Sequence, residues 1–489
     1  MLRACFFSGA EMNFVITEYK KEIALICFIF VGLIATLCFC DSVLFDELEH
    51  LRSSYFVSMG EAPYRDFFEH HHPLIWYLFA PIIKILPYNN IIALYCAKSL
   101  SFSVSCATTY IIFLLVKRFF GGTKIALWTL LLYFFYFPTW YMFSIFKPDT
   151  FSRFFFIFGL YLFFCYSENF RRKYLIWCAI CFTISFLFLQ TAVFYILPLA
   201  LPLFYICCKN KRVIIDCAIS SIIPLLCISI FAVSYFLCGI WQAYFESNWI
   251  FNSYLFGILH TENSLPMFSL EIFAAVISLF YLLCKNKLNF HLSTVAVLFG
   301  FELWFRVILP PPYPHYLVIL FLYAAIIISY AINLLNKKVL WACLYVILFV
   351  NTLINYAYIY VTNNSESLQY LREYNKNPTA PTVVFDNRLM SIFAPKMSYY
   401  WFYPNFCYVD NAIFQRYPNY DINQEIINQK PLYIAYQYGI HPKFNWTRVK
   451  EKYSVHEEYL AQHNLRTELL NDYTEILPNL YQRKVPTDQ

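Results

Sequence analysis

Charged residues are scarce in this sequence. Only 13% of its 489 residues are charged, whereas 60% are hydrophobic. An ordinary soluble protein has about 25% charged and about 45–50% apolar residues. No soluble fold has a core large enough to bury this excess, so a lipid bilayer must be the solvent for much of the chain. The net charge of +6 does not indicate a nucleic-acid-binding protein, because the basic residues stand in short runs between apolar segments.

Glycine is also scarce, with 10 residues in the whole chain. The sequence has neither a glycine-rich phosphate-binding loop nor a Walker motif, which argues against the common nucleotide-hydrolysing classes. The energy for any reaction must therefore come from the substrate itself. So few glycines also predict that the helices do not pack through close glycine contacts.

Apolar segments of helix length recur along most of the chain. We interpret them as about eleven membrane-spanning helices. Their expected ranges are 22–40, 91–116, 125–143, 151–167, 174–190, 193–208, 213–238, 266–284, 290–309, 316–335 and 339–361. The sequence therefore predicts an all-α polytopic membrane domain.

The basic residues alternate between the loops that join these segments. Every second loop is basic, and these loops contain Lys20, Lys21, Lys117, Arg118, Lys124, Arg171, Arg172, Lys173, Lys209, Lys211, Arg212, Lys285, Lys287, Lys337 and Lys338. The intervening loops have few basic residues, namely Arg52, Arg65 and Lys147. Because basic loops remain in the cytoplasm, the N-terminus is predicted to be cytoplasmic. An odd number of spans places the C-terminal tail on the other side.

The first outer loop, residues 41–90, is unusually long. Residues 46–52 have helical periodicity, and this helix is expected to end near Gly60. The apolar stretch 74–86 is too short to cross a bilayer, and it predicts a re-entrant or interfacial helix.

The tail has a different composition from the rest of the chain. Charged residues return there, strand-like runs occur at 382–385 and 432–435, and helix-like runs occur at 365–374 and 455–465. We therefore expect a transmembrane domain over 1–361, followed by a small soluble α/β or α+β domain over 362–489.

The densest group of polar residues lies in the first outer loop. Asp46, Glu49 and His50 are spaced to share one helix face, with Glu47 beside them. Such residues are ordinary in a solvated loop, but these are flanked by apolar helices. Carboxylates and imidazoles together supply a general base or ligands for a divalent metal.

A histidine-rich run follows the first group. Tyr64 to Pro73 reads Tyr-Arg-Asp-Phe-Phe-Glu-His-His-His-Pro, which places Glu69, His71 and His72 together as candidate substrate-binding residues. Three adjacent histidines cannot all face one ion. A dedicated metal site is therefore the less favoured use of this run, although a divalent metal remains possible.

Two further groups stand near the ends of apolar segments. Lys147, Asp149 and Arg153 lie between the third and fourth expected spans, where they either neutralise one another or bind an anionic headgroup. Arg306 lies near the end of the ninth span and is followed by His315 and Tyr316. The Arg306 guanidinium either snorkels to the interface or binds phosphate, whose geometry it matches.

These features together resemble a known family. Asp46-Glu47 after the first span, followed by Gly60-Glu-Ala-Pro-Tyr-Arg-Asp-Phe-Phe-Glu-His-His-His-Pro-Leu74, resembles the dolichyl-phosphate-mannose protein mannosyltransferase superfamily of integral membrane glycosyltransferases. The bacterial branch that contains the lipid A aminoarabinose transferase and the lipopolysaccharide-core glycosyltransferases is the most similar. The resemblance covers roughly the first 360 residues by topology. Its specific motif lies in residues 41–75, with weaker support at Lys147–Arg153 and His315–Tyr316.

The resemblance implies a class C glycosyltransferase fold and transfer of a sugar from a polyprenyl-phosphate donor at the outer membrane face. Asp46 then matches the acid that acts as base, with Glu47 next to it, and Asp149 matches an acid of the second outer loop. The acceptor would be a lipid, a glycan or a protein. The implied location is a bacterial inner membrane, with the C-terminal domain in the periplasm. The aminoarabinose branch has Glu-Lys-Pro where this chain has His71-His72-Pro73, so the charge near the donor headgroup differs.

Three other classes of protein fit parts of the pattern. A transporter or lipid flippase would place polar residues near the middle of the membrane, on helices interrupted by Gly or Pro. A polysaccharide polymerase or ligase would also act on lipid-linked sugars at the outer face. An assembly scaffold would use the tail to bind partners and would not depend on Asp46.

The alternation of basic loops gives a direct test of topology. A reporter enzyme that is active only outside the cytoplasm should be active when fused after Tyr360 and inactive when fused near Lys211. The reason is that the two fusion points lie on opposite sides of the predicted membrane domain. Reporter activity in cells measures both, and the reverse result at either position would contradict the orientation.

Overall fold

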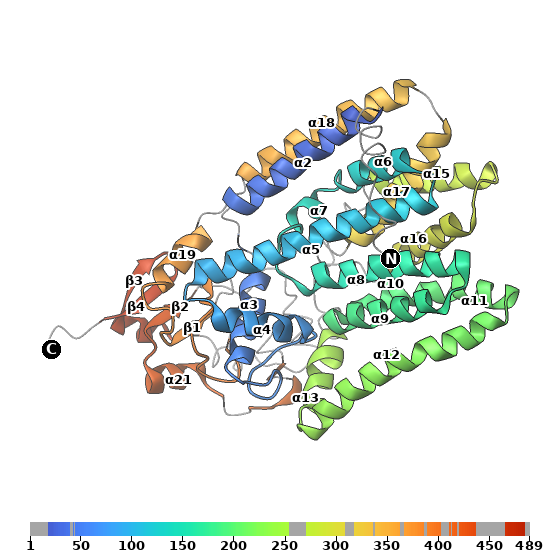
Figure 1. Ribbon diagram of the computed structural model, residues 1–489. Helices are drawn as coiled ribbons and strands as arrows, with labels where there is room; N and C mark the ends of the chain where they lie inside the picture. The colour runs from blue at the N-terminus through green and yellow to red at the C-terminus, as the bar shows by residue number, and fades with distance from the viewer. Residues whose placement is uncertain are drawn as a thin grey trace. The chain divides into compact units, whose positions relative to one another are not determined.

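The computed structural model describes most of the chain. The described residues are 18–39, 43, 45–253, 270–308, 317–335, 338–361, 366–385, 389–401, 410–411, 413–417, 420–436 and 465–484. Helices dominate these residues, and the strands are confined to the C-terminal part (Figure 1).

The helices before the tail follow the apolar segments. They are α2 (Lys20–Phe39), α3 (Phe45–Ser58), α4 (Leu74–Ile85), α5 (Asn90–Phe119), α6 (Thr123–Tyr133), α7 (Phe137–Tyr141), α8 (Pro148–Asn169), α9 (Arg172–Phe188), η2 (Gln190–Ala192), α10 (Val193–Ile196), η3 (Leu197–Leu199), α11 (Ala200–Lys209), α12 (Arg212–Leu237), α13 (Trp241–Phe245), η4 (Glu246–Phe251), α15 (Leu270–Cys284), α16 (Phe290–Ile308), α17 (Val318–Leu335) and α18 (Lys338–Val361). Each segment predicted to span the membrane is helical over most of its length, although 125–143 is broken between α6 and α7.

Five helices in the described part of the chain are long and apolar enough to cross a membrane. They are Asn90–Phe119, Pro148–Asn169, Gln190–Lys209, Arg212–Leu237 and Val318–Leu335. The chain is therefore an integral membrane protein, while the predicted total of about eleven spans stays a prediction. The helix over Leu74–Ile85 is also apolar but shorter, which agrees with the expectation that it does not span.

The residues divide into two compact units. One unit contains 1–40, 100–230 and 261–362, and the other contains 41–99, 231–260 and 363–489. We call them the helical unit and the loop–tail unit. The predicted division into domains 1–361 and 362–489 stays a prediction. In the structure, the tail belongs to the same compact unit as the first long loop.

Helix α17 is the most deeply buried element of the helical unit. Nearly all of its side chains are buried, and it packs against α6, α15 and α16. Helix α12 is different, because large apolar side chains such as Ile222, Leu225 and Ile230 are well exposed on it. An exposed apolar surface of this extent is stable only against lipid.

Two helix pairs of the helical unit approach closely at a glycine, so the prediction that glycine is not used for packing was wrong. A Cβ at Gly159 of α8 would lie 2.5 Å from the Phe182 ring of α9. A Cβ at Gly32 of α2 would lie 2.0 Å from the Tyr356 ring of α18, whose hydroxyl donates to the carbonyl of Phe28 at 2.6 Å. Figure 1 shows α2 and α18 side by side. At both positions the missing side chain of glycine leaves room for an aromatic ring of the neighbouring helix.

The loop–tail unit contains the predicted helices of the first long loop and the predicted sheet of the tail. Helix α3 runs over Phe45–Ser58, is followed by Gly60 in the left-handed region (φ 90°), and packs against α4. The tail elements are α19 (Glu366–Tyr374), β1 (Thr382–Val384), α21 (Ile422–Gln429), β2 (Tyr433–Ala435), η8 (Thr467–Asp472), β3 (Tyr473–Leu477) and β4 (Leu480–Arg483). The predicted helix at 455–465 lies almost entirely outside the described residues.

The four strands form one mixed sheet in the order β1-β2-β4-β3. Strands β1 and β2 are parallel, with Val383 opposite Ile434, and the other two pairs are antiparallel. Both β1 and β2 are fully buried, which agrees with their continuous apolar sequence. The tail is therefore a small mixed domain of helices and strands, as predicted.

The tail is joined to the first long loop by hydrogen bonds within the loop–tail unit. The backbone N–H of Phe68 donates to the carbonyl of Tyr399 at 2.9 Å, and Trp401 Nε1 donates to the carbonyl of Phe68 at 2.9 Å. The buried Arg52 guanidinium lies over the Trp401 ring and donates to the carbonyl of Pro395 at 3.2 Å. These contacts fix the path of the chain just before the histidine-rich run.

The close approach at Gly159 predicts a stability effect. Gly159→Ala should destabilise the protein by about 1–3 kcal/mol, because the added Cβ overpacks the contact with Phe182. Gly300→Ala is the matched control, since it lies in helix α16 and a Cβ there would meet nothing within 4 Å. Thermal unfolding in detergent should show a lower midpoint for the first variant and an equal or higher midpoint for the second. Equal midpoints for wild type and Gly159→Ala would contradict the close contact.

Candidate active site

Helix α3 places four acidic or imidazole side chains within two turns. Asp46 and Glu47 lie in its first turn, where the positive end of the helix dipole stabilises carboxylates. Asp46 is partly exposed, whereas Glu47 and Glu49 are buried. His50 is fully buried, and its Nδ1 accepts a hydrogen bond from Trp76 Nε1 at 3.1 Å. Asp46 is thus the carboxylate of this helix that a substrate can reach.

Glu47, predicted as a catalytic residue, forms a buried ion pair. Its carboxylate lies 3.2 Å from Lys98 Nζ, and the two side chains are 0% and 6% exposed. A buried charge is tolerated when it is paired, so this contact stabilises the start of α3 against the first turns of α5.

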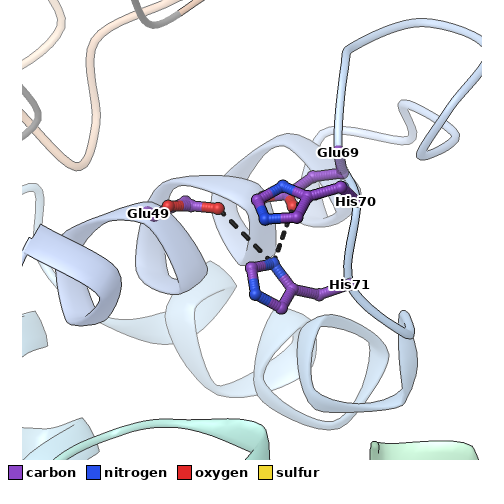
Figure 2. Close-up of side chains that lie close together, drawn as sticks. All are labelled: Glu49, Glu69, His70 and His71. Carbon is purple, nitrogen blue, oxygen red and sulfur yellow. Dashed lines mark hydrogen bonds and ion pairs between the residues drawn. The ribbon is translucent and has the colours of Figure 1, made fainter. Parts of the chain in front are cut away.

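Glu49 belongs to a buried cluster with Glu69, His70 and His71. One ligand atom from each of the four lies within 4.8 Å of the others. His71 Nδ1 lies 3.5 Å from Glu49 Oε1 and 3.4 Å from Glu69 Oε2. Figure 2 shows that the Glu49 side chain comes from a helix, the others come from the adjacent segment, and Glu49 and Glu69 point toward His71.

The Glu69 carboxylate is held by further donors. The Ser53 hydroxyl donates to Glu69 Oε1 at 2.6 Å, and the backbone N–H of His70 donates to Oε2 at 3.1 Å. Glu69 is 0% exposed, so these hydrogen bonds replace the water that it loses on burial. The cluster is therefore built from a helix and a loop that hydrogen-bond directly to each other.

The backbone of the histidine-rich run is fixed by an unusual turn. Tyr64 is in the left-handed region (φ 66°), its N–H donates to the carbonyl of Phe67 at 2.9 Å, and its hydroxyl donates to the carbonyl of His71. Asn252 Nδ2 donates to the carbonyl of His70 at 2.7 Å. A residue type that disfavours positive φ is held there by its surroundings, which is common at functional sites.

Burial and mutual repulsion change the protonation of this cluster. Burial raises the pKa of Glu49 to about 8, and repulsion from Glu69 adds to the shift. Burial by itself would lower the pKa of His71, but the hydrogen bonds and charges of Glu49 and Glu69 outweigh it and raise that pKa to about 10. Burial, helped by repulsion from His71, holds the pKa of His70 well below its usual value. The shifts of Glu49 and His71 therefore depend on each other, because each group responds to the charge of its neighbour.

His72 takes no part in the cluster. Its Nε2 lies 2.9 Å from the hydroxyl of Tyr244, and both side chains are buried. This agrees with the expectation that the three adjacent histidines do not face one ion. Glu49 and Glu69 lie in separate motifs of the sequence, and the structure brings them together with His70 and His71 as four candidate ligands, without His72.

The second predicted group lies at the start of α8 in the helical unit. Lys147 precedes the helix in extended conformation and is buried, Asp149 lies in the first turn and is partly exposed, and Arg153 is buried one turn later. Two cationic side chains and one acid thus stand within the first turns of one helix.

The third predicted group is described only in part. Arg306 Nε lies 3.2 Å from Glu302 Oε2 one turn earlier in α16, and the side chains are 12% and 1% exposed. A bound phosphate would therefore compete with Glu302 for this guanidinium. His315 and Tyr316 lie outside the described residues.

Two residues that position the site were missed in the sequence. Lys98 is a single cation near the start of a long apolar segment, which by itself is a signal for a buried acidic partner. Ser53 carries no such signal, because a serine in a helix is ordinary and its bond to Glu69 depends on tertiary packing.

The fold and the site together define an integral membrane protein with a small C-terminal sheet and a buried carboxylate–imidazole cluster in its first long loop. Residues 70–241 match the family described as dolichyl-phosphate-mannose-protein mannosyltransferase. The match supports this superfamily and, in general terms, a membrane glycosyltransferase that uses a polyprenyl-phosphate sugar donor. The chain has no match among curated proteins. The matched residues include His71, Lys147, Asp149 and Arg153, whereas Asp46 and Arg306 lie outside the match.

The buried pair of Glu47 and Lys98 can be tested by a double-mutant cycle. Glu47→Gln and Lys98→Met should each destabilise the protein by about 3–5 kcal/mol, because each leaves one charge buried without its partner. The double variant should be less destabilised than the sum of the two, measured by thermal unfolding in detergent.

The exposed pair of Glu373 and Lys376 in the tail serves as the control. Its atoms are 2.7 Å apart and Lys376 is 68% exposed, so Lys376→Met should change the unfolding midpoint little. Additive effects of Glu47→Gln and Lys98→Met would show that the two charges are not coupled.

Proposed function

We propose that this protein is an inverting glycosyltransferase of the bacterial inner membrane. It transfers a sugar from a polyprenyl-phosphate donor to a lipid, polysaccharide or protein acceptor on the outer face of the membrane. The family match over residues 70–241 supports the donor class. The acceptor, the bacterial branch and the orientation, with the N-terminus in the cytoplasm and the tail in the periplasm, belong to the proposal.

The position of Asp46 carries the proposed chemistry. It is the partly exposed acid in the first turn of α3, while its neighbours Glu47 and Glu49 are buried. A general base must lie within hydrogen-bond reach of the proton that it removes, which requires an accessible carboxylate on a fixed element. The pair of Glu47 with Lys98 fixes the helix start that carries Asp46.

The proposed reaction is a single displacement. The acceptor hydroxyl or amine attacks the anomeric carbon, its proton passes to the Asp46 carboxylate, and a new bond to the sugar forms. The bond between the anomeric carbon and the phosphate oxygen breaks, and its electron pair leaves with the lipid phosphate. Attack opposite the leaving group inverts the anomeric centre without a covalent enzyme intermediate.

The leaving phosphate needs positive charge around it. Lys147 and Arg153 at the start of α8, and Arg306 near the end of α16, are the candidates for neutralising that charge, with Asp149 beside the first two. Cationic donors that face a developing negative charge lower the barrier to its formation. His315 and Tyr316 remain proposed as substrate-binding residues on the basis of the resemblance.

Glu69, His71 and His72 were predicted to bind substrate, but each of them contacts another side chain of the protein. Their side chains are engaged with Ser53, Glu49 and Tyr244 within the loop–tail unit. We propose that they act on the substrate through the position of α3, whose first turn carries Asp46.

Replacing Asp46 tests the proposed base. Asp46→Asn should lower turnover by about 10²–10⁴-fold with donor binding retained, because asparagine keeps the shape of the side chain but cannot accept the proton. Turnover is measured on purified protein with a polyprenyl-phosphate sugar and membrane-derived acceptors. The sugar product is identified by mass spectrometry.

Asp421→Asn is the matched control for this experiment. Asp421 caps α21 in the tail by accepting from the backbone N–H groups of Asn423 and Gln424, and asparagine preserves such a cap. Its turnover should equal that of the wild type. A folded Asp46→Asn protein with near wild-type turnover would show that the base lies elsewhere, and Asp149→Asn would then be the next variant to measure.

A further inference from the structure

The cluster of Glu49, Glu69, His70 and His71 has a geometry that suits a bound ion. Two donors on a tetrahedral zinc ion, each at about 2.0–2.1 Å, are about 3.3–3.4 Å apart. The observed separations of His71 Nδ1 from Glu49 Oε1 and Glu69 Oε2 are 3.5 and 3.4 Å. Ordinary N–H···O hydrogen bonds have donor–acceptor distances of about 2.7–3.2 Å, so the hydrogen bond between His71 Nδ1 and Glu69 Oε2, at 3.4 Å, is a long one. The two separations match two edges of a shared coordination tetrahedron.

Charge and burial also point to a cation. The Glu49 and Glu69 carboxylates are 3% and 0% exposed, and in the described part of the chain Glu49 Oε1 makes no hydrogen bond of normal geometry. Two buried carboxylates beside one imidazolium leave an uncompensated charge unless a proton or a cation is added. A divalent ion balances both, and the two histidines then bind as neutral ligands.

The neighbouring contacts orient these side chains in advance. Ser53 holds Glu69, Asn252 holds the carbonyl of His70, and Tyr64 holds the carbonyl of His71. Outer contacts of this kind fix ligands in metal sites, because they set the orientation of each donor before the ion binds. Figure 2 shows the Glu49 and Glu69 carboxylates directed at the His71 ring, with His70 beside it.

The mixture of donors selects the metal. Magnesium and calcium prefer all-oxygen sites, and octahedral magnesium would place adjacent donors about 2.8–3.0 Å apart, closer than observed here. Two imidazoles with two carboxylates suit zinc and neighbouring transition metals, and the two distances at His71 are close to the tetrahedral spacing of zinc ligands.

We propose that Glu49, Glu69, His70 and His71 form a binding site for one zinc ion. The ion joins the middle of α3 to the segment before α4 and thereby holds the helix that carries Asp46. This proposal is argued from the geometry of the four side chains and does not depend on the proposed sugar transfer. Zinc binding can be measured without a sugar donor or an acceptor.

The test measures metal in the full-length protein purified in detergent without added chelator. Elemental analysis should find about one zinc per chain. After removal by a chelator, added Zn²⁺ should bind again and raise the thermal unfolding midpoint, whereas Mg²⁺ should do neither. X-ray absorption should show only nitrogen and oxygen neighbours at about 2.0–2.1 Å, which separates this site from any zinc bound by the 17 cysteines.

Variants locate the ion. Glu49→Gln and His71→Gln should each weaken Zn²⁺ binding by at least about 100-fold, and Ser53→Ala, which removes only a supporting hydrogen bond, by about 10–100-fold. His72→Gln is the matched control, because its ring bonds Tyr244 outside the cluster, and it should retain zinc. Ser53→Ala keeps the test valid if the ligand variants fail to fold.

Several results would overturn the proposal. One is purified protein that lacks stoichiometric zinc and also fails to bind added Zn²⁺, and another is sulfur in the coordination shell. The others are a loss of zinc in His72→Gln equal to that in the ligand variants, and an unchanged Zn²⁺ affinity in folded Ser53→Ala and His71→Gln. The turnover of Asp46→Asn tests only the proposed base. Zinc binding by this variant would support the metal site whether or not its turnover falls.

Discussion

Two carboxylates, Glu49 and Glu69, share one buried space in the first long loop, and like charges there repel strongly in the absence of water. Several neighbouring residues compensate for this repulsion. His71 lies between the carboxylates, Ser53 donates to one of them, and the left-handed turn at Tyr64 directs the histidine run inward. The cost of burying these charges is balanced only if α3 and the segment before α4 keep their relative position.

The same constraint governs the start of α3. Glu47 is buried and must have a cation, which Lys98 supplies from the first turns of α5. With Glu47 and Glu49 both held inside, the helix presents Asp46 as its accessible acid. The proposed role of Asp46 as base therefore depends on the buried residues that hold this helix in place.

The helical unit is under a different constraint, because polar groups on a surface that faces lipid have no water to hydrogen-bond. Polar side chains there are paired inside the unit, as with Ser152, whose hydroxyl lies 2.9 Å from that of Ser185 and 2.8 Å from that of Tyr195. Asp216 is fully buried and accepts from Arg172 Nε at 2.7 Å. Pairing of this kind leaves the apolar faces, such as that of α12, free to contact lipid.

Much of the helix pattern could be predicted from the sequence. Helix length in a bilayer follows from membrane thickness, so the apolar segments predicted the ends of α12 to within one residue and those of α8 to within three. The packing of those helices was less predictable, because the close contacts at Gly32 and Gly159 depend on which helix faces which glycine. In the site, the sequence identified Asp46, Glu47, Glu69 and His71 as a polar group, but it did not separate the accessible acid from the buried ones.

The sequence by itself determined the solvent of this protein, the places of its helices and the segment that holds its polar cluster. These properties depend on composition and on spacing along the chain, which tertiary contacts do not change. Only the tertiary structure decided that Glu49 meets Glu69 and His71, that Lys98 pairs with Glu47, and that His72 turns away to Tyr244. Such pairings join residues far apart in sequence, and each is fixed by the need to neutralise or hydrogen-bond a buried polar group, a requirement that arises only once the chain has folded.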